Sequence, residues 1–281
     1  MQPDQELINR WSRSAPFWEQ HRDAIRHMFA PITQALVEDA QIGSGQSVLD
    51  VGTGPGEPAL SLAHVVGPEG KIAGVDPIPE MVAAARREVD HLGIKNVKFE
   101  VAFADRLPFP ADTFDAAVSR LGAMFFPSPI DAVREILRVL KPGRKLAQAV
   151  WHFADTNPFH FVLSRVIDRY AAPQPAPDAW DAFRFAPAGK LRDVLFEAGA
   201  MAPLERLLRF TIHAPMSVED FWTLRLGMSG KLREKVATLP PPKVAEVQRE
   251  VLAALGEYST GQGLSFPAEV LLVSGMKSIS A

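Results

Sequence analysis

The hydrophobic and polar positions between residues 47 and 151 follow two alternating patterns. Short apolar runs that end near glycine, aspartate or proline are typical of buried strands. The longer segments between them carry apolar residues at helical spacing, as Met81, Ala85 and Val89 do before Gly93, a residue that favours a helix end. We therefore predict strands at 47–51, 71–75, 97–101, 113–119 and 144–151, and helices at 58–66, 79–92 and 130–140.

Strands that alternate with helices are joined by right-handed crossovers and form a parallel sheet. The pattern therefore predicts an α/β fold with a doubly wound, mostly parallel, Rossmann-like sheet. Two further strand-like segments, at 204–213 and 267–276, bring this sheet to seven strands. The order of the strands is not fixed by the sequence.

The flanking regions have a different character and suggest three parts. Residues 1–45 are predicted to form a helical N-terminal lid, and residues 46–153 a cofactor-binding α/β core. Residues 154–281 would complete the sheet, cover it with a helix at 191–198, and add a helical cap over the pocket. The cap is predicted from segments at 218–226 and 232–255 and from a stretch rich in proline and aromatic residues between 154 and 190.

The amino-acid composition excludes several classes of function and binding partner for this protein. The 281 residues are 47% hydrophobic, enough for a large core, and carry a formal net charge of −3 from 30 basic and 33 acidic residues. We find no long basic run, so no nucleic-acid partner is predicted. The absence of cysteine excludes disulfides, cysteine metal sites and a thiol nucleophile. No apolar run is long enough for a membrane span and no secretory signal pattern opens the chain, so we predict a cytoplasmic protein.

The segment 48–56, with the sequence VLDVGTGPG, carries the main chemical signal. A short apolar strand leads into a turn with three glycines, which lets a ligand approach bare backbone. The dinucleotide fingerprint would place its third glycine where Glu57 stands, beside a pyrophosphate of like charge. Asp50 adds a second acid just before the turn. Both features favour a cofactor that lacks phosphate and is positively charged, and S-adenosylmethionine meets both requirements.

Four further motifs follow in order, at 74–76, 104–109, 114–115 and 137–143. With the glycine turn, they resemble the class I S-adenosylmethionine-dependent methyltransferases, in particular the ubiquinone/menaquinone-biosynthesis type and its small-molecule relatives. The resemblance covers about residues 45–151, and a weaker similarity extends over residues 266–277. It implies that S-adenosylmethionine is the cofactor and S-adenosylhomocysteine the product.

The resemblance also implies roles for individual residues. Asp50 and the turn would meet the methionine end of the cofactor, Asp76 the ribose hydroxyls, and Asp105 the adenine amino group. Each acid has a plainer alternative: a helix-cap acid at Asp50, a turn former before Pro77 at Asp76, and a surface acid at Asp105. The complete predicted cofactor set is Asp50, Gly52, Thr53, Gly54, Gly56, Asp76, Pro77, Ile78, Met81, Ala104, Asp105, Arg106, Ser119, Arg120 and Leu121.

Methyl transfer from a sulfonium is an in-line displacement, so alignment of the reactants is the main requirement. A general base is needed only where the acceptor loses a proton during attack. His152, after the fifth predicted strand, is the first candidate and His21 the second, while His160 and His213 are expected to be structural or exposed. The histidines show no paired spacing near a glutamate, so no metal is predicted.

Aromatic residues gather where pocket loops and cap are expected, and two explanations compete. They line an apolar or aromatic acceptor site, or they form the core that joins the cap to the sheet. Trp11, Trp18, Phe125 and Trp151 are the predicted acceptor-pocket residues. The other members of the group are Phe17, Phe126, Phe153, Phe159, Trp180 and Phe183.

The predicted function is methyl transfer from S-adenosylmethionine to the oxygen, nitrogen or carbon of a small apolar or aromatic acceptor. One alternative is a catalytically silent regulator that binds the same cofactor. Another is a nicotinamide-dependent oxidoreductase, which is disfavoured because neither Tyr170 nor Tyr258 is followed four residues later by lysine. Residues 119–122 lack the motif of enzymes that methylate nucleic-acid bases. The identity of the acceptor and a homodimeric state are left open.

Overall fold

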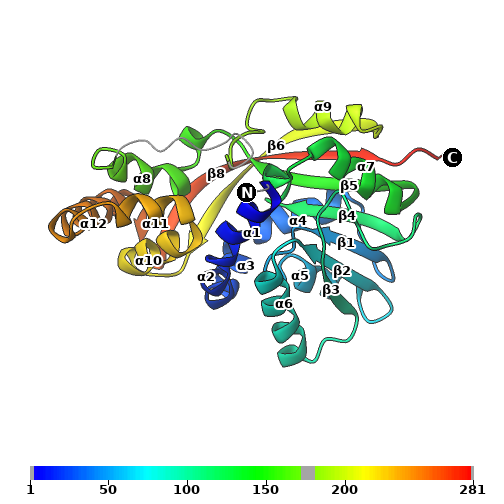
Figure 1. Cartoon of the computed structure of the whole chain (residues 1–281), viewed down its shortest axis with the longest axis horizontal. Coiled ribbons are helices and arrows are strands. Elements are labelled where there is room, and N and C mark those ends of the chain that lie inside the picture. Colours follow the sequence, from blue (N-terminus) through cyan, green and yellow to red (C-terminus); the bar gives the residue numbers. More distant parts are fainter. Residues whose placement is uncertain (1–2, 172–180, 280–281) are drawn as a thin grey trace.

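A central eight-stranded sheet organises residues 3–171 and 181–279, which are the residues described by the computed structural model (Figure 1). The strand order is β3-β2-β1-β4-β5-β8-β6, with β7 paired to β8. The strands are β1 (Ser47–Val51), β2 (Lys71–Asp76), β3 (Val97–Val101), β4 (Phe114–Arg120), β5 (Leu140–Trp151), β6 (Met201–Ala214), β7 (Ser259–Thr260) and β8 (Gly263–Met276).

Strands β1 to β5 are parallel, and β8 is antiparallel to both β5 and β6. This confirms the predicted doubly wound, mostly parallel sheet. In the described residues the sheet has eight strands rather than seven, because the two-residue strand β7 pairs with the start of β8. The order runs outward from β1 in both directions, so the crevice at the carboxyl ends of β1 and β4 is the topological switch point where ligands bind in such sheets.

Five helices pack on the sheet or beside its strands. Their apolar faces explain the periodic pattern that predicted most of them, and the observed ends of the four helices with predicted bounds differ from the prediction by at most one residue. They are α4 (Ala30–Asp39), α5 (Ala59–Val66), α6 (Pro79–Leu92), α7 (Pro129–Val139) and α9 (Lys190–Glu197).

A long antiparallel ribbon carries the sheet into the cap. The pairing of β8 with β5 ends where Trp151 lies opposite Val270, whereas its pairing with β6 continues until Ala214 lies opposite Leu264. Figure 1 shows this ribbon reaching from the sheet to a group of helices at the far end of the molecule. These cap helices are α8 (Pro158–Ile167), α10 (Val218–Met228), α11 (Gly230–Ala237) and α12 (Pro241–Leu255). Helix α8 was not predicted, because its segment was interpreted only as rich in proline and aromatic residues.

Aromatic packing fixes the cap to the ribbon. Phe266, on the overhanging part of β8, is fully buried. Its ring lies 4.9 Å from that of Phe221 on α10, 6.1 Å from that of Phe159 on α8, and 5.0 Å from that of Tyr258. These four aromatic side chains therefore form a core that joins the cap to the sheet.

The N-terminal helices lie between the sheet and the cap (Figure 1). They are α1 (Pro3–Ser12), α2 (Ala15–Gln20) and α3 (Arg22–Met28), and α2 packs against both α6 of the core and α10 of the cap. Buried side chains from 1–45, 46–153 and 154–281 form one continuous hydrophobic cluster. The division into three parts therefore stays a prediction.

Replacing Phe266 by alanine tests the aromatic attachment of the cap. Removal of a fully buried ring costs about 3–5 kcal/mol of the free energy of unfolding. The control is Phe196→Ala on α9, where the side chain is 73% exposed and the expected change is within about 0.5 kcal/mol. Urea unfolding of both variants provides the comparison, and equal losses would contradict this account of the cap.

Candidate functional site: a cofactor cleft and an adjoining cavity

The glycine turn after β1 has the backbone geometry that the sequence requires. Gly52, Gly54 and Gly56 have φ angles of 76°, 55° and 110°, in the region that side chains other than glycine rarely adopt. The amides of Gly52 and Thr53 donate to the carbonyl oxygen of Val75 at 2.8 and 3.0 Å. The turn is therefore held against the end of β2.

Asp76, the last residue of β2, fixes the other side of the turn. Its Oδ2 accepts the amide of Gly54 at 2.9 Å, and its Oδ1 accepts the amide of Ile78 at 3.0 Å. Burial raises the pKa of Asp76 to about 6, although the two amide hydrogen bonds act in the opposite direction. A carboxylate offers about four acceptor positions, so each oxygen keeps one for a ligand.

Asp50 lies beneath the turn rather than in the wall of the cleft. Its Oδ2 accepts the hydroxyl of Thr53 at 2.6 Å and the amide of Ala59, the first residue of α5, at 3.1 Å. Its Oδ1 has no hydrogen-bond partner among the described residues, and burial raises the pKa of Asp50 to about 7. These contacts match the helix-cap alternative. The predicted contact with the methionine end stays a prediction.

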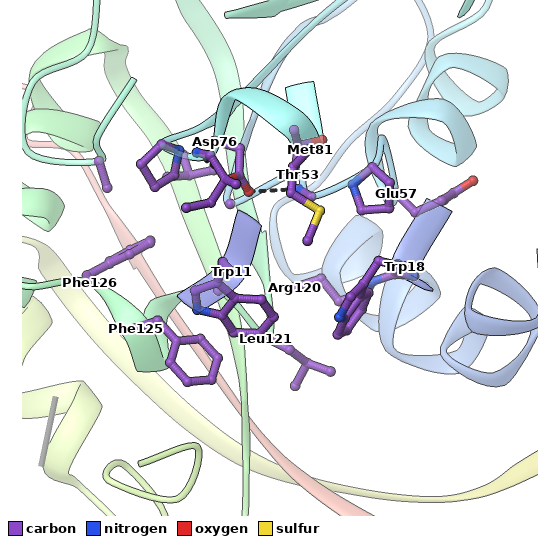
Figure 2. A pocket seen from close by; sticks show the side chains of 18 of the residues that line it. Trp11, Trp18, Thr53, Glu57, Asp76, Met81, Arg120, Leu121, Phe125 and Phe126 are labelled. Atoms are coloured by element: carbon purple, nitrogen blue, oxygen red, sulfur yellow. Dashed lines mark hydrogen bonds between the residues drawn. The ribbon is translucent and has the colours of Figure 1, made fainter. Parts of the chain in front are cut away.

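The cleft itself opens at the carboxyl ends of β1, β2 and β4 and is closed by the N-terminal helices. In Figure 2, Trp11 and Trp18 face it from the side opposite Asp76 and Met81. Its lining consists of residues 51–55, 76–78, 102–104, 120–122 and 125–127 with Trp11, Trp18, Arg22, Ile25, Phe29, Glu57 and Met81.

The structure brings most of the predicted cofactor residues together and leaves five outside the lining. Ten line the cleft: Gly52, Thr53, Gly54, Asp76, Pro77, Ile78, Met81, Ala104, Arg120 and Leu121. Asp50, Gly56, Asp105, Arg106 and Ser119 do not.

Three of the outlying residues have clear positions. The Asp105 carboxylate lies 3.4 Å from the Arg106 guanidinium, which also stands 5.0 Å from the ring centre of Phe103. Ser119 is fully buried directly under Gly122, where an added Cβ would lie 2.9 Å from its hydroxyl oxygen. Their roles toward the cofactor stay predictions.

Arg22 is a cleft residue that the sequence analysis missed. From the start of α3, its Nε donates to the carbonyl of Pro55 at 2.9 Å and its Nη2 to the carbonyl of Ala84 at 3.0 Å. Its Nη1 lies 2.6 Å from the Glu88 carboxylate. The side chain thus ties the N-terminal segment to both the glycine turn and α6. In the sequence Arg22 stands among other charged residues, so no pattern distinguishes it.

The second arginine of the cleft also has internal partners. Arg120 donates from Nη1 to the hydroxyl of Thr33 at 2.8 Å and stands 6.0 Å from the ring centre of Phe29. Burial lowers the pKa of Arg120, while the nearby carboxylates of Glu57 and Asp50 raise it. With both arginines engaged, the cleft offers the Asp76 carboxylate beside bare backbone, and Glu57 adds negative charge nearby although its Oε2 accepts the hydroxyl of Ser61 at 2.6 Å. This fits a positively charged cofactor without phosphate better than a pyrophosphate.

A second cavity adjoins the cleft under the cap. The two share Trp11, Trp18, Phe29, Leu121 and Phe125. The rings of Trp11 and Phe125 lie 5.1 Å apart, and those of Trp11 and Trp18 lie 6.0 Å apart. Trp151 lines the second cavity only. All four predicted acceptor residues thus lie in the walls of this cavity, whereas Trp180 lies outside the described residues.

The two predicted bases are not among the residues that line either cavity. His152 has its Nδ1 2.8 Å from the carboxylate of Glu269, which also pairs with Arg209. His21 stands between α2 and α3, where burial lowers its pKa. Neither lines the cleft or the second cavity. His160, expected to be structural or exposed, does line the second cavity, and burial holds its pKa well below the usual value.

Two further searches cover the described parts of the chain. Within residues 3–171 and 181–279, no three histidine, aspartate or glutamate side chains are arranged to hold a metal ion. In the same residues, none of the helices combines the length and the apolar character that crossing a membrane requires.

Comparisons with known proteins agree with this geometry. A family described as "Methyltransferase domain" matches residues 42–163. The uncharacterized methyltransferase YcgJ of Bacillus subtilis is 29% identical over 247 residues, 86% of this chain and 88% of that protein. The ubiquinone/menaquinone biosynthesis C-methyltransferase UbiE of Pseudomonas fluorescens is 33% identical over 136 residues, 48% of this chain and 52% of that protein. The match to UbiE therefore spans about half of each protein.

Solved structures show the same fold. YcgJ aligns with a TM-score of 0.53 and 23% identity over 87% of this chain and 97% of that one. Phosphoethanolamine N-methyltransferase 2 of Haemonchus contortus, crystallised with S-adenosyl-L-methionine, aligns with a TM-score of 0.56 and 14% identity over 92% of this chain and 57% of that one.

Strand order, the glycine turn and the acid at the end of β2 define a Rossmann-like fold with a cleft suited to a nucleoside cofactor. Together with the sequence matches, they place the chain in a narrower group. The match of residues 42–163 to the methyltransferase family and the similarity to YcgJ and UbiE support a class I S-adenosylmethionine-dependent methyltransferase, with S-adenosylmethionine as the cofactor.

Replacing Arg22 by methionine tests its role in holding the glycine turn. The change leaves two carbonyl groups and Glu88 without their donor, so we expect a loss of about 1–3 kcal/mol in the free energy of unfolding and weaker binding of S-adenosylhomocysteine. Arg87→Met is the control, because Arg87 forms an exposed pair with Glu19 and we expect little measurable change. Denaturant titration and calorimetry measure both effects. Wild-type values for Arg22→Met would contradict this role.

Proposed function

We propose that the protein transfers the methyl group of S-adenosylmethionine to a small apolar or aromatic acceptor bound in the second cavity. The observation that carries the proposal is the junction of the two cavities at Trp11, Trp18, Leu121 and Phe125. A donor in the cleft and an acceptor under the cap would meet at this aromatic junction. Alignment of the two reactants is the main contribution that a protein makes to such a displacement.

On the donor side, Asp76 would accept the two ribose hydroxyls through the acceptor positions that its backbone contacts leave open. Ile78 and Met81 are both 3% exposed and line the cleft next to it, so they would pack on the adenine. The glycine turn would bind the methionine end through backbone groups. The carboxylates of Asp76 and Glu57 would favour the positive charge of the donor over a phosphate-bearing nucleotide.

On the acceptor side, seven tryptophan and phenylalanine residues line the second cavity, which supports a planar, apolar substrate. The proposal needs no general base for an acceptor that is already ionised or has a free lone pair. His152 and His21 are not supported as bases by their positions outside the lining. The similar proteins include both a C-methyltransferase and an N-methyltransferase, so the accepting atom stays open.

Turnover tests the proposed function directly. The protein would be incubated with methyl-labelled S-adenosylmethionine and a panel of phenols, aromatic amines and hydroxylated aromatic acids. We expect label in an organic product and equimolar S-adenosylhomocysteine. Tight binding of S-adenosylmethionine without transfer to any member of the panel would instead support the silent-regulator alternative.

The pH dependence of cofactor binding tests the role of Asp76. The hydroxyl donors of the ribose need the carboxylate form, so lowering the pH through the raised pKa of about 6 should weaken S-adenosylhomocysteine binding. Asp76→Asn should weaken binding about tenfold or more at pH 7.5 and remove most of the pH dependence between pH 5 and 7.5.

Asp90→Asn, an exposed change at the far end of α6, is the matched control and should keep the wild-type profile. Calorimetry at a series of pH values gives both results. A wild-type profile in Asp76→Asn would show that Asp76 only shapes the turn.

The raised pKa of Asp76 also affects stability. Because the folded state holds the proton of Asp76 more tightly than the unfolded state, the free energy of unfolding decreases as the pH rises from 3.8 to about 6. Hydrogen bonds donated by the bound cofactor to the Asp76 carboxylate would offset part of this loss.

A further inference from the structure

Arg225 is a buried cation in the wall of the second cavity. It lies on α10 and is 5% exposed. Its Nε donates to the carbonyl of Phe159 at 3.1 Å, and its guanidinium carbon stands 4.3 Å above the ring centre of the same residue. Its Nη2 lies 3.4 Å from Nδ1 of His160. No carboxylate of the described residues lies within 4.0 Å of its guanidinium, and burial alone lowers its pKa to about 10.

Two other deeply buried basic side chains of the two cavities form ion pairs, Arg22 with Glu88 and Lys235 with Asp168. A third, Arg120, has no ion pair but lies near the carboxylates of Glu57 and Asp50, which raise its pKa. A buried charge without an opposite charge is costly, because neither water nor a counterion replaces its hydration. Arg225 has only a carbonyl, a ring and an imidazole around it, so its positive charge is left for a ligand to balance.

His160 adds a second unused polar group beside Arg225. An arginine can only donate, so Nδ1 of His160 must be the acceptor and the proton of the neutral ring sits on Nε2. That Nε2 is buried and has no hydrogen-bond partner among the described residues. Burial first, and Arg225 second, keep the pKa of His160 well below its usual value, so the ring does not add a second charge. A cation and an unpaired N–H donor therefore stand side by side.

The charge of the whole lining points the same way. The second cavity is lined by four basic side chains, Arg10, Arg225, Lys231 and Lys235, against the two acids Asp168 and Asp181. Two of the cations face acids, because Arg10 lies 3.9 Å from Glu234 and Lys235 pairs with Asp168. The lining still carries more positive than negative charge, and in a cavity with low-dielectric walls such an excess favours anionic ligands.

The aromatic residues around His160 restrict the shape of a ligand that this cavity can bind. Trp151, Phe159 and Phe183 surround His160, with ring centres 4.4, 5.2 and 5.2 Å from its own. Aromatic walls of this kind favour a planar ring. We propose that the acceptor of the second cavity is a planar aromatic compound bearing an anionic oxygen, and that Arg225 is the residue that pairs with this oxygen. This assignment rests on the proposed function and specifies its substrate class.

A matched pair of ligands tests the assignment. 1-Hydroxy-2-naphthoate carries a carboxylate, and 1-hydroxy-2-naphthamide has the same ring and nearly the same size without the charge. Calorimetry would be performed on the protein saturated with S-adenosylhomocysteine. We expect the wild type to bind the naphthoate at least about tenfold more tightly than the amide, as for a buried charge that gains its partner.

Arg225→Met should abolish this preference and leave the affinity for S-adenosylhomocysteine unchanged, while Arg225→Lys should keep part of the preference. The control is Arg249→Met, an exposed arginine of the same cap on α12 that lines neither cavity and should behave as the wild type. Far-ultraviolet circular dichroism confirms that each variant is folded. Should Arg225→Met fail to fold, the wild-type ligand pair and Arg225→Lys still decide the question.

The outcomes separate this inference from the proposed function. Wild-type affinity for the naphthoate no greater than for the amide, including undetectable binding of both, overturns the anionic subsite while S-adenosylhomocysteine binding remains intact. A preference that survives in Arg225→Met shows that another group selects the anion and also overturns the assignment. Failure of the wild type to bind S-adenosylhomocysteine would instead overturn the proposed function.

Discussion

The carboxylate of Asp76 joins the parts that form the cofactor cleft. One of its oxygens holds the glycine turn at the end of β1, and the other holds the backbone that leads into α6. The glycine turn also donates two hydrogen bonds to the carbonyl of Val75 in β2, so the ends of two strands and the start of α6 share one set of hydrogen bonds. The Asp76 carboxylate is buried by this arrangement, and its burial raises its pKa. Each of its oxygens still has one acceptor position for a ligand in the cleft. If the proposed function holds, cofactor binding and local folding depend on the same side chain.

The second cavity depends on a different constraint, the unequal length of neighbouring strands. Because β6 and β8 continue past the end of β5, the overhanging ribbon provides a surface on which α8 and α10 pack through Phe159, Phe221 and Phe266. The N-terminal helices fill the space between this cap and the core, and Trp11 and Trp18 reach the boundary of the two cavities. The acceptor space is therefore built from segments far apart in the sequence.

The cofactor half of the site could be predicted from the sequence to a large extent, because its residues follow strand ends and lie within local motifs. The turn at Gly52 and Gly54 and the acid at Asp76 are positions of this kind. In the second cavity the aromatic residues Trp11, Trp18, Phe125 and Trp151 were predicted, but the polar residues Arg225 and His160 were not. Like Arg22 in the cleft, they acquire their surroundings only through tertiary packing. His152 was chosen for its place after a strand, but the structure pairs it with Glu269 on β8, outside both cavities. Asp50 illustrates an intermediate case, since its position was predicted while its observed contacts are those of a helix cap.

The central claim is that the cleft beside Asp76 holds the methyl donor and that the aromatic junction lies at its reacting end. A crystal structure of the protein grown with S-adenosylhomocysteine is the most direct test. The account predicts the ribose hydroxyls on the Asp76 carboxylate, the adenine against Ile78 and Met81, and the sulfur directed toward Trp11 and Leu121. A ligand bound elsewhere, or one in the cleft with its ribose away from Asp76, would contradict it.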